Sequence, residues 1–254
     1  MKNTIQRAKV RLLRMHFESG VGHIGGNLSC LELLMVIHHR VLGADDVFVL
    51  SKGHAAGALY VTLWSLGHLT DADLETFHRD GTRLAGHPPP TSIPEIRFAT
   101  GSLGHGLPLA AGVALGKKLQ RVDGRVLCLV SDGEINEGST WEAMIFAARH
   151  HLDNLTIVVD VNGLQGFGTT REVSGLGSPE EALRGLGIDT TIVDGHDSDE
   201  IGAALMKRTA GPHLIIARTT KGRGVSFMEN RMEWHYLPMT QAQYEQALAE
   251  IGGL

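Results

Sequence analysis

The sequence predicts an α/β protein with a doubly wound, mainly parallel sheet that is covered by helices on both faces. Short apolar runs typical of buried strands alternate with segments of helical periodicity along most of the 254 residues. No low-complexity linker or internal repeat interrupts this alternation, so we expect one domain over residues 1–254. With 43% hydrophobic and 20% charged residues, such a chain can bury a sizeable core.

Helical spacing of apolar residues predicts the helices, beginning with residues 4–18. Ser29, with Glu32 three residues later, predicts the capped start of a second helix that runs to about Val41. We expect the remaining helices at residues 55–66, 107–119, 134–150, 199–208 and 241–251.

Short apolar runs predict the strands, at residues 46–50, 126–130, 155–160, 191–193 and 213–217. In a sheet of this kind the ligand belongs at the carboxyl ends of the strands. The Gly- and Pro-rich segment 81–106 is too long for a passive connection, so we expect it to contribute to binding.

Asp132 and Asn162 each stand just past an apolar run, and one predicted crossover helix separates the two runs. This spacing is typical of adjacent parallel strands, which would place both side chains at one edge of the sheet. Carboxylate, amide and backbone carbonyl oxygens are ligands that suit a Mg²⁺ ion holding a diphosphate. A helix beginning near Ile135 would direct its free N–H groups to the same place. The alternative is an ordinary strand-to-helix turn with a capping Asp.

The chain contains 14 histidines, several of which follow a glycine in loops, and His23, His54, His87 and His105 stand in GH or GHxGG-like settings where the backbone approaches closely. A loop histidine on its own is more often a surface or hydrogen-bonding residue. The following histidines are expected on the surface, at helix caps or in packing: His38, His39, His68, His78, His150, His151, His196 and His213.

The net charge and the cysteine residues indicate which binding partners and which cellular compartment we expect. A net charge of -5 and a pI of about 6.3 give no reason to expect binding to nucleic acid or to an anionic membrane. Cys30 and Cys128 lie in apolar stretches without metal-like spacing, so we expect both to pack in the core. No long apolar run or leader-like segment is present, which predicts a cytoplasmic protein.

The segment SDGEINEGSTWEA, followed by LDNLTIVVDVNGLQ, resembles the thiamine-diphosphate motif of the transketolase family. The resemblance extends, in the same order along the chain, to SGVGHIGGNLS, FVLSKGHAAGALY, LAGHPPP, TGSLGHGLPLAAGVALG and TTKGRGVSFMENRMEWHY. These blocks cover nearly the whole sequence. They imply the thiamine-diphosphate-binding fold and the N-terminal, diphosphate-binding half of a split transketolase.

The resemblance implies catalytic roles for four histidines. His23 would manage protons on substrate hydroxyls, and His54 would touch both the diphosphate and the reacting end of the donor. His87 would hydrogen-bond the donor hydroxyls, and His235 would bridge diphosphate and substrate. A neutral imidazole can both donate and accept, which suits reversible carbon–carbon cleavage.

The resemblance also implies the cofactor and metal contacts. Asp132, Asn162 and the carbonyl of Leu164 would bind Mg²⁺, and Asn162 would contact the cofactor as well. Gly101 and Leu103 would bed thiamine diphosphate, and Gly133 would let the diphosphate approach the backbone.

Glu137 has two interpretations. As an acid in the first turn of a helix, it would interact favourably with the positive end of the helix dipole. The resemblance instead implies a cofactor-site acid, buried at a subunit interface, that couples two thiamine sites.

Several positions depart from the family pattern. Ser131 replaces the first glycine of the diphosphate turn, and His105 stands where Gln is frequent. Gly166 occupies the place of an apolar residue near the cofactor rings, with Phe167 as a candidate substitute. Tyr236 replaces a glycine after His235, which predicts an entrance of different shape.

The family takes part of its active site from a pyrimidine-binding domain, and no block resembling that domain or the C-terminal domain is present. We therefore expect a separate C-terminal subunit that carries the pyrimidine-binding domain, in an α2β2 heterotetramer. The implied activity is transfer of a two-carbon glycolaldehyde unit from a ketose or ketose phosphate to an aldose. The alternatives are the α-type subunit of a 2-oxo-acid-decarboxylating thiamine enzyme, and a non-catalytic scaffold subunit.

Overall fold

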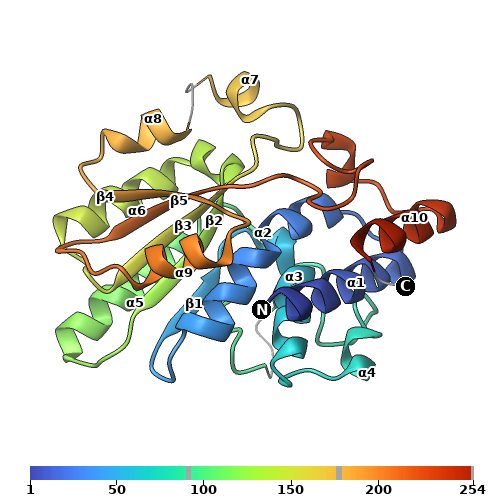
Figure 1. Ribbon diagram of the computed structural model, residues 1–254. Coiled ribbons are helices and arrows are strands. Elements are labelled where there is room, and N and C mark those ends of the chain that lie inside the picture. Colours follow the sequence, from blue (N-terminus) through green and yellow to red (C-terminus); the bar gives the residue numbers. More distant parts are fainter. Residues whose placement is uncertain (90–92, 176–178, 253–254) are drawn as a thin grey trace.

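The computed structural model describes residues 1–89, 93–175 and 179–252, and its centre is a parallel sheet (Figure 1). Five strands are hydrogen-bonded in the order β1-β2-β3-β5-β4, and all pairs are parallel. The predicted strands are thus confirmed, with small changes at their ends. Their bounds are β1 (Val47–Leu50), β2 (Val126–Ser131), β3 (Leu155–Val161), β4 (Asp189–Asp194) and β5 (His213–Arg218).

Helices cover both faces of this sheet, as predicted (Figure 1). Alternation along β2 shows why: Leu127 and Leu129 pack in one core, whereas Cys128 and Val130 pack in the other. The first core receives α1 (Lys2–Ser19), α2 (Ile24–Val36), α3 (Ala56–Ser65) and α9 (Ser198–Met206), and the second receives α5 (Gly106–Gln120) and α6 (Gly138–Arg149). Both faces are therefore apolar, as a doubly covered parallel sheet requires.

The second helix begins earlier than the sequence predicts, and Ser29 is not its cap. The helix α2 starts at Ile24, after His23 in a left-handed conformation. Ser29 is buried inside α2, where its hydroxyl lies within hydrogen-bond distance of the Gly26 carbonyl (3.0 Å) and of the Asp160 carboxylate (2.6 Å). The Ser-x-x-Glu pattern lies inside a buried helix and does not mark the start of one.

The predicted helix 134–150 is two elements. A 3₁₀ turn η3 (Gly133–Asn136) follows β2, and α6 begins only at Gly138, after Glu137 with extended backbone angles. The free N–H groups expected near Ile135 therefore belong to the 3₁₀ turn rather than to an α-helix.

Short elements occupy segments for which the sequence predicted none. They are η2 (Gly53–Ala55), α4 (Asp71–Leu74), α7 (Thr170–Ser174), α8 (Pro179–Arg184) and η4 (Met232–His235). Both α4 and α7 begin with a complete capping box, Thr70 with Asp73 and Thr169 with Glu172. The second predicted helix ends as a π-helical turn η1 (Ile37–Val41), and the last helix α10 (Gln241–Ile251) lies beside α1, as seen in Figure 1.

Cys30 and Cys128 are buried and unpaired, as predicted. Residues 90–92 of the predicted binding loop lie outside the described residues. No described helix is both long and apolar enough to cross a membrane. The cytoplasmic location and the single domain over residues 1–254 stay predictions.

Candidate cofactor site

The polar cavity of interest opens at the carboxyl ends of β2 and β3. Residue Ser131 of β2 pairs with Asp160 of β3, so the turns that carry Asp132 and Asn162 leave the sheet side by side. The cavity measures about 310 Å³. It is lined by all but one of the predicted site residues: His23, His54, His87, Gly101, Leu103, Asp132, Gly133, Asn162, Leu164 and His235.

Four histidines from distant parts of the chain converge in this cavity. The ring centroid of His23 lies 5.0 Å from that of His235, 5.7 Å from that of His54 and 5.8 Å from that of His87. His54 and His235 are themselves 5.7 Å apart. The four residues that the sequence motifs singled out therefore form one cluster.

A buried amide fixes two of these histidines. The Nδ2 group of Asn27 donates to the backbone carbonyls of His23 (2.8 Å) and His54 (3.1 Å), and its Oδ1 accepts from the backbone N–H of Ala58 (2.7 Å). His23 has φ 67°, which is uncommon for a residue other than glycine. Asn27 thus holds a strained residue in place from the first turn of α2. No local pattern in the sequence indicates this role.

The site histidines are neutral at physiological pH. Burial, followed by neighbouring positive groups, lowers the pKa of His23 to about 4 and that of His235 to about 3. The same causes hold the pKa of His54 well below its usual value, and burial lowers that of His87. Each ring can therefore donate one hydrogen bond and accept another at pH 7.

Asp132 is buried at the base of the cavity, and backbone and side-chain donors hold its carboxylate. It accepts hydrogen bonds from the backbone N–H groups of Gly133 (2.8 Å) and Gly163 (2.7 Å) and from the Thr170 hydroxyl (3.0 Å). Burial, and then the nearby Asp160 carboxylate, raise its pKa to about 6. A carboxylate that is costly to ionise when buried is well suited to a cation.

The donor set around Asp132 fits a hard cation held together with a diphosphate. The Asn162 amide oxygen accepts from the Leu164 backbone N–H at 3.1 Å, so the asparagine and the Leu164 backbone share one turn. Within the described ranges no three His, Cys, Asp or Glu side chains group as a metal site by themselves. A cation here would therefore depend on one carboxylate, on neutral oxygens and on oxygens of its ligand.

Two lysines belong to the site and were missed by the sequence analysis. Lys221 lines the cavity, and its Nζ lies 3.3 Å from His235 Nδ1. Burial, and then the charge of Lys52, lower the Lys221 pKa to about 8, so it stays largely cationic at pH 7. Lys52 is buried in an ion pair with Asp160 and also donates to the Gly26 carbonyl (3.1 Å), and its charge acts on Lys221. The sequence blocks SKGH and TTKGRG contain these lysines, but nothing in the sequence alone shows that they are buried.

Of the predicted site residues only Glu137 lies outside the cavity, and the loop residue His105 lies outside it as well. Glu137 is exposed at the start of α6, and its side chain makes no capping hydrogen bond there. Glu137 directly precedes α6 and so does not lie in its first turn, as the first interpretation required, whereas its burial at a subunit interface stays a prediction. His105 is exposed as well, and its Nδ1 lies 3.2 Å from the Leu103 carbonyl.

Phe167 does not replace the side chain that Gly166 lacks. It is 87% exposed and points away from the core, although it contributes to the rim of the cavity. The group that contacts Gly166 is the hydroxyl of Tyr236.

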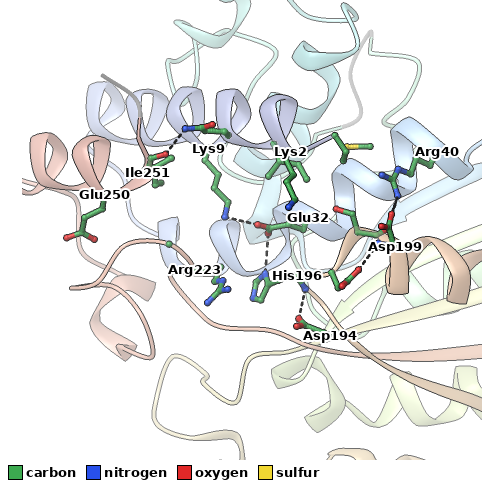
Figure 2. Close-up of a pocket in the computed structure, with 16 residues that line it drawn as sticks. Lys2, Lys9, Glu32, Arg40, Asp194, His196, Asp199, Arg223, Glu250 and Ile251 are labelled. Carbon is green, nitrogen blue, oxygen red and sulfur yellow. Dashed lines mark hydrogen bonds and ion pairs between the residues drawn. The ribbon is translucent and has the colours of Figure 1, made fainter.

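A second cavity, of about 630 Å³, lies between α1, α10 and the turn after β4 (Figure 2). Glu32 at its wall pairs with Lys9 (2.6 Å) and lies 3.3 Å from His196 Nδ1. The other ring nitrogen of His196 accepts from the backbone N–H of Thr220 (2.9 Å), next to Lys221. His196 is thus a packing residue, as predicted, that braces the segment carrying a site lysine.

The parallel sheet and the polar cavity at its carboxyl edge define a cofactor-binding α/β domain. The family model for the transketolase, thiamine diphosphate binding domain, matches residues 7–253. The chain therefore belongs to the transketolase family, as the sequence motifs implied.

Individual relatives include both separate subunits and longer transketolases. The chain is 36% identical to a subunit of the apulose-4-phosphate transketolase of Phocaeicola vulgatus, over 97% of this chain and 92% of that protein. It is also 36% identical to a 6-deoxy-6-sulfo-D-fructose transketolase subunit of a Clostridium species, over 91% of this chain and 89% of that protein. The crystal structure of the Campylobacter jejuni transketolase matches with a TM-score of 0.86 and 28% identity. This chain covers 42% of that longer protein.

Proposed function

We propose that this chain is the diphosphate-binding subunit of a two-component transketolase. It would act with thiamine diphosphate to transfer a two-carbon glycolaldehyde unit from a ketose or ketose phosphate to an aldose. The observation that carries the proposal is the convergence of His23, His54, His87 and His235 above the Asp132 turn. Relatives of nearly the same length that are named as transketolase subunits support it.

Asp132, Asn162 and the Leu164 carbonyl would hold Mg²⁺, and the metal would bind the cofactor diphosphate. Gly133 would offer close backbone approach, and the Lys221 ammonium supplies a positive charge next to His235. Charge-assisted contacts of this kind are stronger than those between neutral groups. When bound, thiamine diphosphate supplies the carbon nucleophile and electron sink for making and breaking the carbon–carbon bond.

The histidines would bind and reprotonate the sugar. Cleavage next to a hydroxyl removes the hydroxyl proton, and joining to the acceptor returns a proton to the new alcohol. His23 and His87 would handle these hydroxyls, because a neutral ring can take a proton and give one back. His54 and His235 would lie between the diphosphate and the sugar.

The partner would be a separate subunit with the pyrimidine-binding domain, and we propose an α2β2 assembly. Apolar side chains beside the cavity are exposed: Phe167, which lines it, and Met232 and Leu237, which lie in the segment around His235. Such a group is typical of a protein–protein contact. We propose that the partner covers it, and that the coupling role of Glu137 would likewise arise only in the assembly.

The four histidines favour hydroxylated sugars over the 2-oxo acids of the alternative α-type subunit. The experiment supplies the chain with its partner subunit, Mg²⁺ and thiamine diphosphate, and follows a carbon-labelled ketose and a labelled 2-oxo acid in parallel. We expect label to move as a two-carbon unit to the aldose, without release of CO₂. Decarboxylation of the 2-oxo acid without ketol transfer would favour the alternative enzyme, and neither reaction would favour a scaffold.

A further inference from the structure

A tyrosine bridges the mouth of the histidine cavity. The Tyr236 hydroxyl donates to the backbone carbonyl of Gly166 at 2.9 Å. Gly166 lies in the loop after β3, whereas Tyr236 directly follows η4, and both line the cavity. The Tyr236 ring also contacts His235 edge-on, with centroids 4.8 Å apart. One side chain thus connects two cavity-lining segments that lie far apart in the sequence.

Two glycines make room for this tyrosine. A Cβ atom on Gly166 would lie 2.3 Å from the Tyr236 hydroxyl, and a Cβ atom on Gly22 would lie 2.5 Å from the Tyr236 carbonyl oxygen. Real Cβ atoms do not approach other atoms so closely. Tyr236 therefore occupies the space that a side chain at position 166 would take, and its backbone is packed beside His23.

We propose that the Tyr236–Gly166 bridge limits the length of the sugar that this chain accepts, so that short sugars are favoured over long ones. The inference rests on the proposed ketol transfer and names the substrate class within it. The reacting carbons must reach the four histidines, and the far end of the sugar then points back toward the mouth. A short sugar ends before the bridge, whereas a long one meets the tyrosine ring.

The bridge is half exposed, so it can open. Tyr236 has 54% of its surface accessible, and a single hydrogen bond between neutral groups is a modest contact. A long sugar is therefore disfavoured rather than excluded, and its penalty is the cost of displacing Tyr236. Removing the hydroxyl should loosen the bridge, and removing the whole side chain should abolish it.

The test compares Tyr236→Phe, Tyr236→Gly and the wild-type chain, each assembled with the partner subunit, Mg²⁺ and thiamine diphosphate. The matched control is Tyr244→Phe, because Tyr244 stacks on Phe17 at α10, away from the cavity. With one ketose donor, kcat/KM is measured for a three-carbon and for a five-carbon aldose phosphate. Thermal melting shows whether each variant is folded.

We expect Tyr236→Gly to raise the five-carbon to three-carbon ratio of kcat/KM by about fivefold or more, and Tyr236→Phe by about twofold to threefold. Tyr244→Phe should leave the ratio unchanged. Ratios within about twofold of wild type for both Tyr236 variants, in an active and folded complex, would overturn the inference alone. A wild-type complex without ketol transfer to either aldose would overturn the proposed function, and the inference with it.

A second readout needs neither turnover nor the partner. Diethyl pyrocarbonate modifies accessible neutral histidines, and peptide mapping gives the rate at His235. We expect this rate to increase about twofold or more in Tyr236→Phe and further in Tyr236→Gly, with Tyr244→Phe unchanged. Equal rates in all four proteins would show that the tyrosine does not cover the mouth, which would also overturn the inference.

Discussion

The backbone N–H of His23 donates to the backbone carbonyl of His235 at 3.1 Å, so an early and a late segment of the sequence meet inside the site. Asn27 then ties His23 to His54 through their carbonyl groups. The three histidines are consequently positioned by contacts of their backbones.

Asn27→Ala should lower both stability and activity. It removes two donated hydrogen bonds and leaves the buried Ala58 N–H without its acceptor, so we expect the free energy of unfolding to fall by about 2–3 kcal/mol. Urea unfolding and ketol transfer measure the two effects. The matched control is Asn154→Ala, which loses one bond to the Ala114 carbonyl away from the site and should keep wild-type kcat. A wild-type kcat in Asn27→Ala would contradict the positioning role.

Asp132→Asn should strongly weaken Mg²⁺-dependent cofactor binding. The variant keeps the size of the side chain but removes the negative charge that the proposed cation needs, so we expect thiamine diphosphate affinity to fall by at least about tenfold. Isothermal titration of the assembled complex with and without Mg²⁺ checks this. The control is Asp153→Asn, a surface position paired with Lys118. Undiminished activity of Asp132→Asn at limiting cofactor would refute the metal assignment.

His87→Ala and His54→Ala should differ toward the cofactor. His87 is exposed on the wall of the cavity and would contact the donor sugar, so its loss should raise the donor KM and lower kcat with cofactor affinity nearly unchanged. His54 is held next to Gly26, deeper in the cavity, and its loss should weaken the binding of both the cofactor and the donor sugar. Titrations of cofactor and donor separate the two variants. Identical cofactor affinities would show that one of the two assignments is wrong.

Stability should fall on mild acidification, because buried histidines outside the site stay neutral when folded. Burial lowers the pKa of His16 and of His38 from 6.5 to about 4. Their contribution is fully present above pH 6.5 and is lost as the pH falls toward 4, by about 1.4 kcal/mol per pH unit for each group. Asp132, whose pKa rises to about 6, acts in the opposite sense.

Urea unfolding at about pH 7 and about pH 5 checks this prediction, with His38→Gln as the comparison. The variant lacks one of the titrating groups, so its stability should depend less steeply on pH than that of the wild-type chain. Equal stability of the wild-type chain at the two pH values would contradict the neutral buried histidines.

Local patterns predicted what depends on neighbours in the sequence. Apolar runs that end in Asp132 and Asn162 located the strands and the cavity edge, because the carboxyl ends of parallel strands must meet. Contacts between segments far apart in the sequence could not be predicted in this way. Lys52 pairs with Asp160, and Lys221 contacts His235, only when separate segments pack together.

The start of α2 shows the same limit. The helix was predicted to start at Ser29, but it begins at Ile24, and Gly25 lies where its backbone packs closely against the site. A Cβ atom on Gly25 would lie 3.1 Å from Lys221 Cγ and 3.2 Å from Trp234. Gly25 thus permits close packing and does not break the helix, and one sequence cannot distinguish these two uses of a glycine.

The central claim is that this chain supplies half of a transketolase active site. The most direct measurement is the rate of ketol transfer at a fixed amount of the chain as its partner subunit is titrated in. We predict no transfer by the chain alone or by the partner alone, and a rate that rises to a plateau at an equimolar ratio. Turnover by the isolated chain at the rate of the mixture would contradict this claim.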